Sequence, residues 1–176
     1  DIRFNQGSLI TQIKELGFEI QQKARADVLV EEALKTSAIE GEKLDPDAVR
    51  SSVGRKLGLP DAGLKEVKDQ KADGLVEILL DATINYSKKM TSERIWGWHA
   101  ALFPTGYSGM LKISVGRWRD DSNGPMRVVS GPTGQKKVHF EAPPAKNLDK
   151  EMQTFISWIN ETSQLDGIIR AGLVHI

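Results

Sequence analysis

Helix start and stop signals divide the first part of the chain into short helical segments. Gly41 follows the mixed apolar and charged residues of 27–40 and is suited to end that helix, because glycine adopts the left-handed conformation without a Cβ penalty. Asp45 and Pro46 are suited to the N-cap and first turn of the next helix, which Gly58 closes. Helices that follow one another this closely predict a mainly α-helical fold.

Apolar residues recur at helical spacing along most of the remaining chain. We expect further helices over 6–22 and 73–88, after the capping residue Thr91, over 147–161 and from Leu165 onward. Residues 126–130 and 136–141 are β-type runs on either side of a Gly-Pro-Thr-Gly turn, a pattern typical of a hairpin. The expected fold class is therefore mainly α, with a small β-hairpin and an N-terminal helical extension.

The composition excludes several classes of function. Lys plus Arg and Asp plus Glu number 24 each, so no net charge favours nucleic acid or an anionic membrane surface. The chain has no cysteine, which excludes disulfides and thiolate chemistry and fits a reducing compartment. The sequence shows neither a signal peptide nor an apolar run of about 18 residues. We therefore expect a cytoplasmic protein that does not enter a membrane.

Glu40 is a carboxylate in an unfavourable place. It lies in the last turn of the 27–40 helix, where the negative end of the helix macrodipole costs it about 0.3–1 kcal/mol. Thr36, four residues earlier, shares its face of the helix. A carboxylate at this position favours a cation outside the helix as its partner. The competing interpretation is that Glu40 and Glu42 are only solvated.

Residues 36–41 match the pattern Ser/Thr-x-x-x-Glu-Gly/Asn, with Thr36, Glu40 and Gly41 at the specified positions. This pattern is the inhibitory-helix signature of Fic proteins, which transfer AMP from ATP to hydroxyl side chains. Further segments are similar to successive parts of that family in the same order: 34–45, 49–53, 98–106, 116–119, 126–131 and 138–144. Over nearly its whole length, the chain resembles a bacterial Fic/DOC-fold AMP-transferase with an N-terminal inhibitory helix.

The active-site motif of that family, His-x-Phe-x-Asp/Glu-Gly-Asn-Gly-Arg/Lys, does not occur in residues 1–176. His175 is not the motif histidine, because no Gly-Asn-Gly follows it. The resemblance implies a longer protein in which the motif follows Ile176, so we expect neither a catalytic residue nor a metal ligand in this chain. It also implies ATP and Mg2+ as cofactors, a protein partner with a Ser, Thr or Tyr hydroxyl, and a possible homodimer.

The resemblance assigns roles to two groups of residues. Thr36, Glu40 and Gly41 belong to the inhibitory helix, and Glu40 would pair with the arginine of the missing motif and so misalign the γ-phosphate of ATP. Val138, His139 and Phe140 lie in the hairpin that the family calls the flap, which docks the target segment. From the residues alone, the competing interpretation is a purely structural hairpin with His139 on its surface.

The resemblance also sets the expected domain boundaries. Residues 1–60 form an N-terminal helical region with the inhibitory helix, 61–72 a connector, and 73–176 the N-terminal part of the Fic core with its flap. An alternative function is a non-catalytic regulatory or protein-interaction module. A further alternative is helix-turn-helix DNA binding by 49–59, which holds Arg50, Arg55 and Lys56, although the neutral net charge argues against it.

Two further groups have a chemical and a structural interpretation. Arg117 and Arg119 flank Trp118 and could bind phosphate, but we favour two arginines packed on an aromatic ring. His99 follows Trp98 on an apolar helix face, which favours a buried, hydrogen-bonded histidine. The 3 histidines of the chain lack the spacing of metal ligands, so we expect no metal site.

Overall fold

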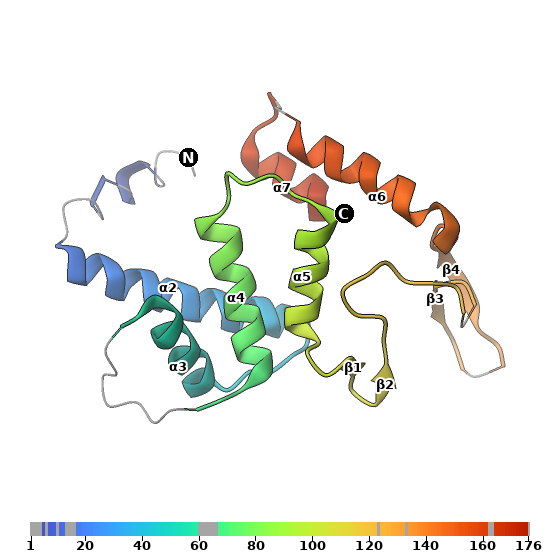
Figure 1. Cartoon of the computed structure of the whole chain (residues 1–176), viewed down its shortest axis with the longest axis horizontal. Helices are drawn as coiled ribbons and strands as arrows, with labels where there is room; N and C mark the ends of the chain where they lie inside the picture. The colour runs from blue at the N-terminus through green and yellow to red at the C-terminus, as the bar shows by residue number, and fades with distance from the viewer. Residues whose placement is uncertain are drawn as a thin grey trace. The chain divides into compact units, whose positions relative to one another are not determined.

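The computed structural model describes residues 5, 7–9, 11–12, 17–59, 67–122, 124–132, 134–161 and 164–175. It is mainly helical with two small antiparallel strand pairs, which confirms the predicted fold class (Figure 1). The described helices are α2 (Phe18–Ile39), α3 (Pro46–Leu57), α4 (Gln70–Ile84), α5 (Ser92–Leu102), α6 (Ala145–Asn160) and α7 (Gly167–His175). The strands are β1 (Tyr107–Ser108), β2 (Leu111–Lys112), β3 (Arg127–Ser130) and β4 (Lys137–Glu141).

The chain forms two compact units, Asp1–Asn85 and Tyr86–Ile176. In the first unit, α2, α3 and α4 pack against one another (Figure 1). Their shared core consists of small and medium apolar residues, three from each helix: Leu29, Val30, Ala33, Ala48, Val49, Val53, Ala72, Val76 and Leu80. Small core residues let the three helix backbones approach closely.

Local signals account for the helix ends. Gly41 has a φ of +79°, its N–H donates to the carbonyl of Ala38 (3.1 Å), and the N–H of Glu42 donates to that of Ser37 (2.8 Å). These two bonds form a Schellman motif, so the prediction that Gly41 ends the helix is confirmed. Asp45 is the N-cap of α3 and accepts from the N–H of Asp47 at 2.9 Å, as the sequence predicts.

Two helix boundaries differ from the prediction. The sequence predicts two separate helices, 6–22 and 27–40. This prediction is wrong from Phe18 onward, because the single helix α2 runs without a break to Ile39. Gly17, in extended conformation, precedes α2. Some residues of 6–22 lie outside the described part. The expected helix 73–88 spans Gln70–Ile84 instead, because the Asp69 carboxylate accepts from the N–H groups of Lys71 (2.8 Å) and Ala72 (3.1 Å).

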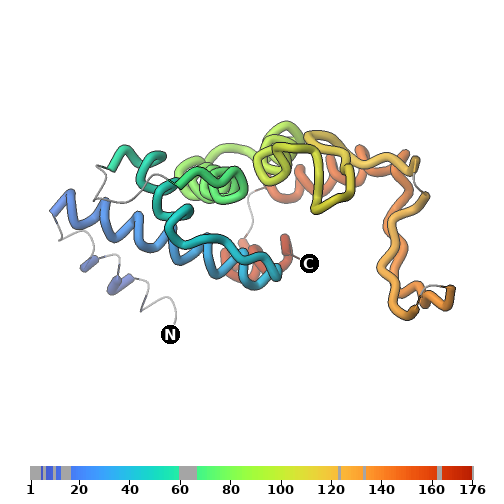
Figure 2. Tube along the Cα trace, turned by 90° about the horizontal axis from the view of Figure 1, so that it is seen from below, coloured from blue at the N-terminus to red at the C-terminus, as the bar shows by residue number. Residues whose placement is uncertain are grey.

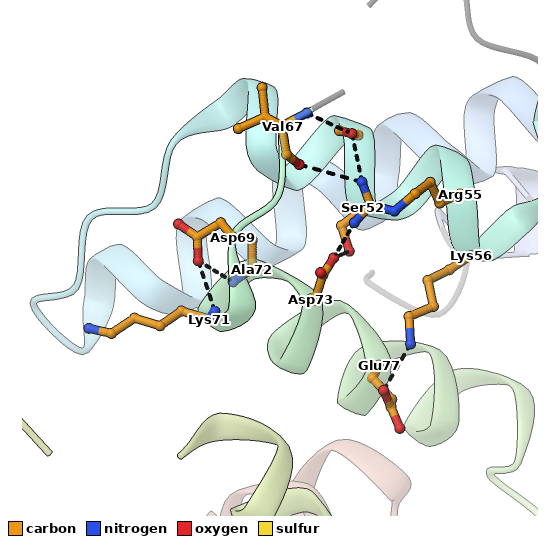
Figure 3. A network of polar contacts seen from close by, with 10 residues as sticks. Ser52, Arg55, Lys56, Val67, Asp69, Lys71, Ala72, Asp73 and Glu77 are labelled. Carbon is orange, nitrogen blue, oxygen red and sulfur yellow. Dashed lines mark hydrogen bonds and ion pairs between the residues drawn. The ribbon is translucent and has the colours of Figure 1, made fainter. Parts of the chain in front are cut away.

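Polar side chains join α3 to α4 (Figure 3). The Asp73 carboxylate accepts hydrogen bonds from the hydroxyl of the fully buried Ser52 and from the Arg55 guanidinium, both at 2.5 Å. Lys56 pairs with Glu77 at 2.8 Å on a more exposed side of the same contact. The predicted connector over 61–72 lies partly outside the described residues. In the structure α4 packs with α2 and α3, and the first unit ends at Asn85.

The second unit is held by polar and aromatic contacts. The Asn160 side chain accepts from the N–H of Met90 (2.8 Å) and donates to its carbonyl (2.7 Å). Trp96 and Trp118 meet edge to face with ring centroids 5.3 Å apart. All the described residues of the hydrophobic core belong to the first unit. Between α5 and β3, the strands β1 and β2 form a short antiparallel pair that the sequence analysis did not predict.

Candidate functional site

Glu40 is the C-cap residue of α2, and its N–H donates to the carbonyl of Thr36 at 3.3 Å. Its side chain is exposed, and the last turn of α2 contains no basic residue. Within the described part of the chain, no hydrogen bond or ion pair engages the Glu40 carboxylate. The position therefore combines the negative end of a helix with an uncompensated carboxylate, which attracts a cation.

Glu42, two residues further, differs from Glu40. Its carboxylate pairs with the ammonium group of Lys71 on α4 at 3.2 Å, with both side chains well exposed. Such a surface pair contributes about 0–1 kcal/mol. Of the two carboxylates that follow α2, Glu42 has a cationic partner from the chain itself, and Glu40 points to solvent.

The other residues of the signature have distinct surroundings. The Thr36 hydroxyl donates to the Glu32 carboxylate at 3.4 Å, one turn back, rather than to Glu40. Gly41 supplies the left-handed turn that ends the helix beside Glu40. Ile39 is 82% exposed, although it is large and apolar. The sequence analysis did not single out Ile39. Its position outside the apolar spacing of the helix indicates that it faces solvent.

The hairpin predicted at 126–141 is present as β3 and β4. Figure 2 shows its two strands side by side, with no third described strand next to either. The register pairs Val128 with Phe140 and Val129 with Val138, and a bulge leaves His139 without a partner residue on β3. Because successive strand residues point to opposite faces, Val128 and Val129 place Phe140 and Val138 on opposite faces. The three predicted docking residues therefore do not form one surface.

Every residue of β3 and β4 is exposed, including Phe140 at 58% and Val138 at 48%. His139 lies within 2.6 Å of the Ser130 hydroxyl, measured from its ring Nε2. At the other end, the Arg127 guanidinium donates to the Glu141 carboxylate at 2.6 Å. Contacts between the two strands therefore hold the hairpin together at both ends. Its apolar side chains and outer edges face solvent.

Arg119 has a structural position. Its guanidinium pairs with the Asp121 carboxylate at 2.6 Å and donates to the carbonyl of Pro143. The other Asp121 oxygen accepts from the N–H of Ala145 (2.7 Å), the first residue of α6. The pair therefore joins the segment after Trp118 to the start of α6. The predicted packing of both arginines on the Trp118 ring stays a prediction. Arg117 is exposed.

His99 departs from the prediction. Its ring packs against Phe103 with centroids 5.0 Å apart, but its Nδ1 is buried and has no hydrogen-bond partner among the described residues. The predicted hydrogen bond is therefore wrong for this nitrogen. The indole N–H groups of Trp96 and Trp118 are likewise buried without partners in the described part of the chain.

The helix-turn-helix alternative depends on basic residues of α3. Two of them, Arg55 and Lys56, pair with acidic residues of α4. Within the described residues, no group of three or more His, Asp or Glu side chains could hold a metal ion. None of the described helices has the length and apolar character needed to cross a membrane.

Comparison with known proteins finds a family match for one part of the chain. Residues 1–59 match the model of a family described as a domain of unknown function, DUF4172. No curated protein matches the chain. The matched residues include α2 and α3, and so Glu40 and its turn, but the family description assigns them no activity.

Proposed function

We propose that residues 1–176 form the regulatory and target-docking part of a Fic-type protein adenylyltransferase. The supporting observation is the exposed, unpaired Glu40 at the C-cap of α2, within a sequence that resembles the inhibitory signature of that family. The reaction that the resemblance implies is transfer of AMP from ATP to a hydroxyl side chain of a target protein. The catalytic motif for this reaction does not occur in residues 1–176.

Glu40 acts as the inhibitory residue by pairing with a guanidinium. The C-terminus of α2 carries a partial charge of about −0.5, to which the carboxylate adds its own charge. An arginine can bind a carboxylate through two parallel hydrogen bonds, so it is the cation that best fits this position. If this arginine belongs to the missing motif, it cannot hold the γ-phosphate at the same time, and ATP binds without correct alignment.

Ile39 gives this contact an apolar component. It is next to Glu40 in the chain and is 82% exposed, so docking of the helix end against a catalytic core would remove its side chain from water. Complete burial of an isoleucine side chain contributes about 1.5–3 kcal/mol. The inhibited state would then combine one ion pair with one buried apolar side chain.

ATP and Mg2+ would be the cofactors of the whole enzyme. The described residues do not fit them, because they offer no cluster of metal ligands and Arg119 is engaged by Asp121 and Pro143. We therefore assign no catalytic step to this chain. Its second contribution is target docking by the β3–β4 hairpin, whose free edges can pair with an extended segment through main-chain hydrogen bonds.

The test uses the longer protein that carries the catalytic motif. We expect Glu40→Gln to raise the incorporation of labelled AMP by about 10- to 150-fold, because it removes an ion pair of about 1.5–3 kcal/mol from the inhibited state. Glu40→Gly should have the same effect. Glu42→Gln is the matched control, since this neighbouring carboxylate pairs with Lys71 within the chain. Equal incorporation in Glu40→Gln and the unaltered protein would refute the inhibitory role.

A second candidate is a non-catalytic protein-interaction module. The observation that favours it is the exposure of large apolar residues at two separate places, Ile39 at the end of α2 and Phe140 on β4. This candidate predicts no AMP incorporation in any variant of the longer protein. It also predicts that Ile39→Ser weakens capture of a partner without any nucleotide present.

A further inference from the structure

The two outer edges of the β3–β4 hairpin differ. The strand β4 carries the bulge at His139, and Lys137 at its start follows Lys136. Bulges and lysines are the features that protect an edge strand from pairing with another chain. The strand β3 has neither, and its centre is the β-branched pair Val128 and Val129. The edge of β3 is therefore the open one.

Charge is unevenly distributed along the hairpin. At the end away from the turn, Arg127 and Glu141 neutralise each other through a 2.6 Å ion pair. At the turn end, Lys136 and Lys137 are exposed, and no ion pair joins either to an acidic residue in the described part of the chain. The turn end is therefore a positive site beside an open strand edge.

We propose that the outer edge of β3 binds an extended protein segment that runs antiparallel to Arg127–Ser130 and begins with acidic residues. This inference rests on the proposed docking role of the hairpin and adds the class of segment that it accepts. Antiparallel pairing is slightly more stable than parallel pairing. Because β3 runs toward the turn, an antiparallel segment starts beside the turn. Lys137 pairs with Ser130 of β3, so Lys136 and Lys137 lie one strand away from the first residues of that segment, within range of a long-range charge interaction.

The side chains of β3 define the middle of this segment. Val128, opposite Phe140, lies on one face of the hairpin, and Val129, opposite Val138, lies on the other. A segment paired with β3 therefore meets apolar side chains on both faces. The preferred sequence is acidic at its N-terminal end and β-branched on both faces thereafter.

The test measures binding of peptides to the 1–176 chain by fluorescence anisotropy. The probe is a labelled peptide of three glutamates followed by alternating valine and threonine. Matched peptides carry three glutamines in place of the glutamates, or the glutamates at the C-terminal end. Two carboxylate–ammonium contacts of about 8 Å in water correspond to about fivefold in affinity. We expect the glutamate-first peptide to bind about fivefold more tightly than either matched peptide at low salt.

A double variant, Lys136→Glu with Lys137→Glu, should reverse this preference and favour a lysine-first peptide. Lys146→Glu, an exposed substitution on α6, is the control and should change nothing. Equal binding of the glutamate and glutamine peptides would overturn the acidic preference. Should the double variant fail to fold, the peptide series on the unaltered chain still decides this point.

Amide hydrogen exchange identifies the edge. Peptide binding should slow exchange of solvent-facing amides in Arg127–Ser130, and slower exchange only in Lys137–Glu141 would overturn the assignment to β3. None of these measurements requires AMP transfer. Peptide binding without AMP incorporation in the longer protein would therefore refute the proposed enzyme activity and leave the docking inference intact.

Discussion

Asp73 joins α3 to α4, and replacing it should destabilise the first unit selectively. Its carboxylate accepts from the Ser52 hydroxyl and from the Arg55 guanidinium, each at 2.5 Å (Figure 3). Ser52 is fully buried, whereas the side chains of Arg55 and Asp73 are 33% and 36% exposed. In Asp73→Ala the buried hydroxyl loses its acceptor, and Arg55 loses its ion-pair partner.

The expected cost follows from these burials. A buried hydroxyl left without its partner costs about 1–3 kcal/mol, and a partly exposed ion pair about 0–1 kcal/mol. We therefore expect Asp73→Ala to lower the free energy of unfolding of the first unit by about 2–3 kcal/mol. Glu77→Ala is the matched control on the same helix, because the Lys56–Glu77 pair is more exposed and should be worth less than about 1 kcal/mol.

The assay is urea denaturation followed by two probes. All 4 tryptophans, Trp96, Trp98, Trp118 and Trp158, lie in the second unit, so their fluorescence does not report on the first. Circular dichroism at about 222 nm follows the helices of both units. With a urea m-value of about 1 kcal/mol/M, Asp73→Ala should lower the first-unit midpoint by about 2–3 M. Equal shifts for Asp73→Ala and Glu77→Ala would refute the reasoning, as would a fluorescence shift of the same size.

Three other predictions use matched positions. Gly58 follows the last residue of α3 and has a φ of +65°, so Gly58→Ala should cost about 1 kcal/mol. Gly54 lies within α3, so Gly54→Ala should stabilise the helix by about 0.5–1 kcal/mol. Thermal melting followed by circular dichroism compares the two. Val49→Ala in the core should cost about 2 kcal/mol by urea denaturation, and Val28→Ala, 64% exposed, should be within about 0.5 kcal/mol of neutral. A hydrogen bond from its own backbone N–H and one from the Thr91 hydroxyl lower the pKa of Glu93 below its ordinary 4.5. The stability that Glu93 gives α5 is therefore fully present above about pH 4.5 and is lost as the pH falls through the lowered folded-state pKa. Glu93→Gln should remove this part of the acid sensitivity in tryptophan fluorescence, and an unchanged acid profile would contradict it.

The helix ends were predictable because capping depends on residues close in sequence. Gly41 ends α2 and Asp45 begins α3 through hydrogen bonds that span at most five positions. Thr91 caps α5 by accepting from the N–H of Arg94, again within one turn. The hairpin was predictable for the same reason, since its two strands flank a short turn. Each of these features requires only backbone geometry and a side chain a few residues away.

Features that depend on distant residues were not predictable. The pairing of Glu42 with Lys71, and of Ser52 with Asp73, joins positions more than twenty apart in the chain. The bulge at His139 follows from cross-strand register, and no local pattern marks it. The extent of α2 was misjudged, because two helices were expected over 6–22 and 27–40, whereas one helix runs from Phe18 to Ile39 after Gly17.

The sequence by itself determined the mainly helical fold, the end of α2 at Gly41 and the presence of a hairpin, because local backbone preferences decide all three. It also placed Glu40 at the negative end of a helix. Only the tertiary structure distinguished Glu40 from Glu42, since packing of α4 against α2 and α3 brings Lys71 to one carboxylate and leaves the other exposed. Cross-strand register, in turn, divided Val138 and Phe140 between two faces of the hairpin.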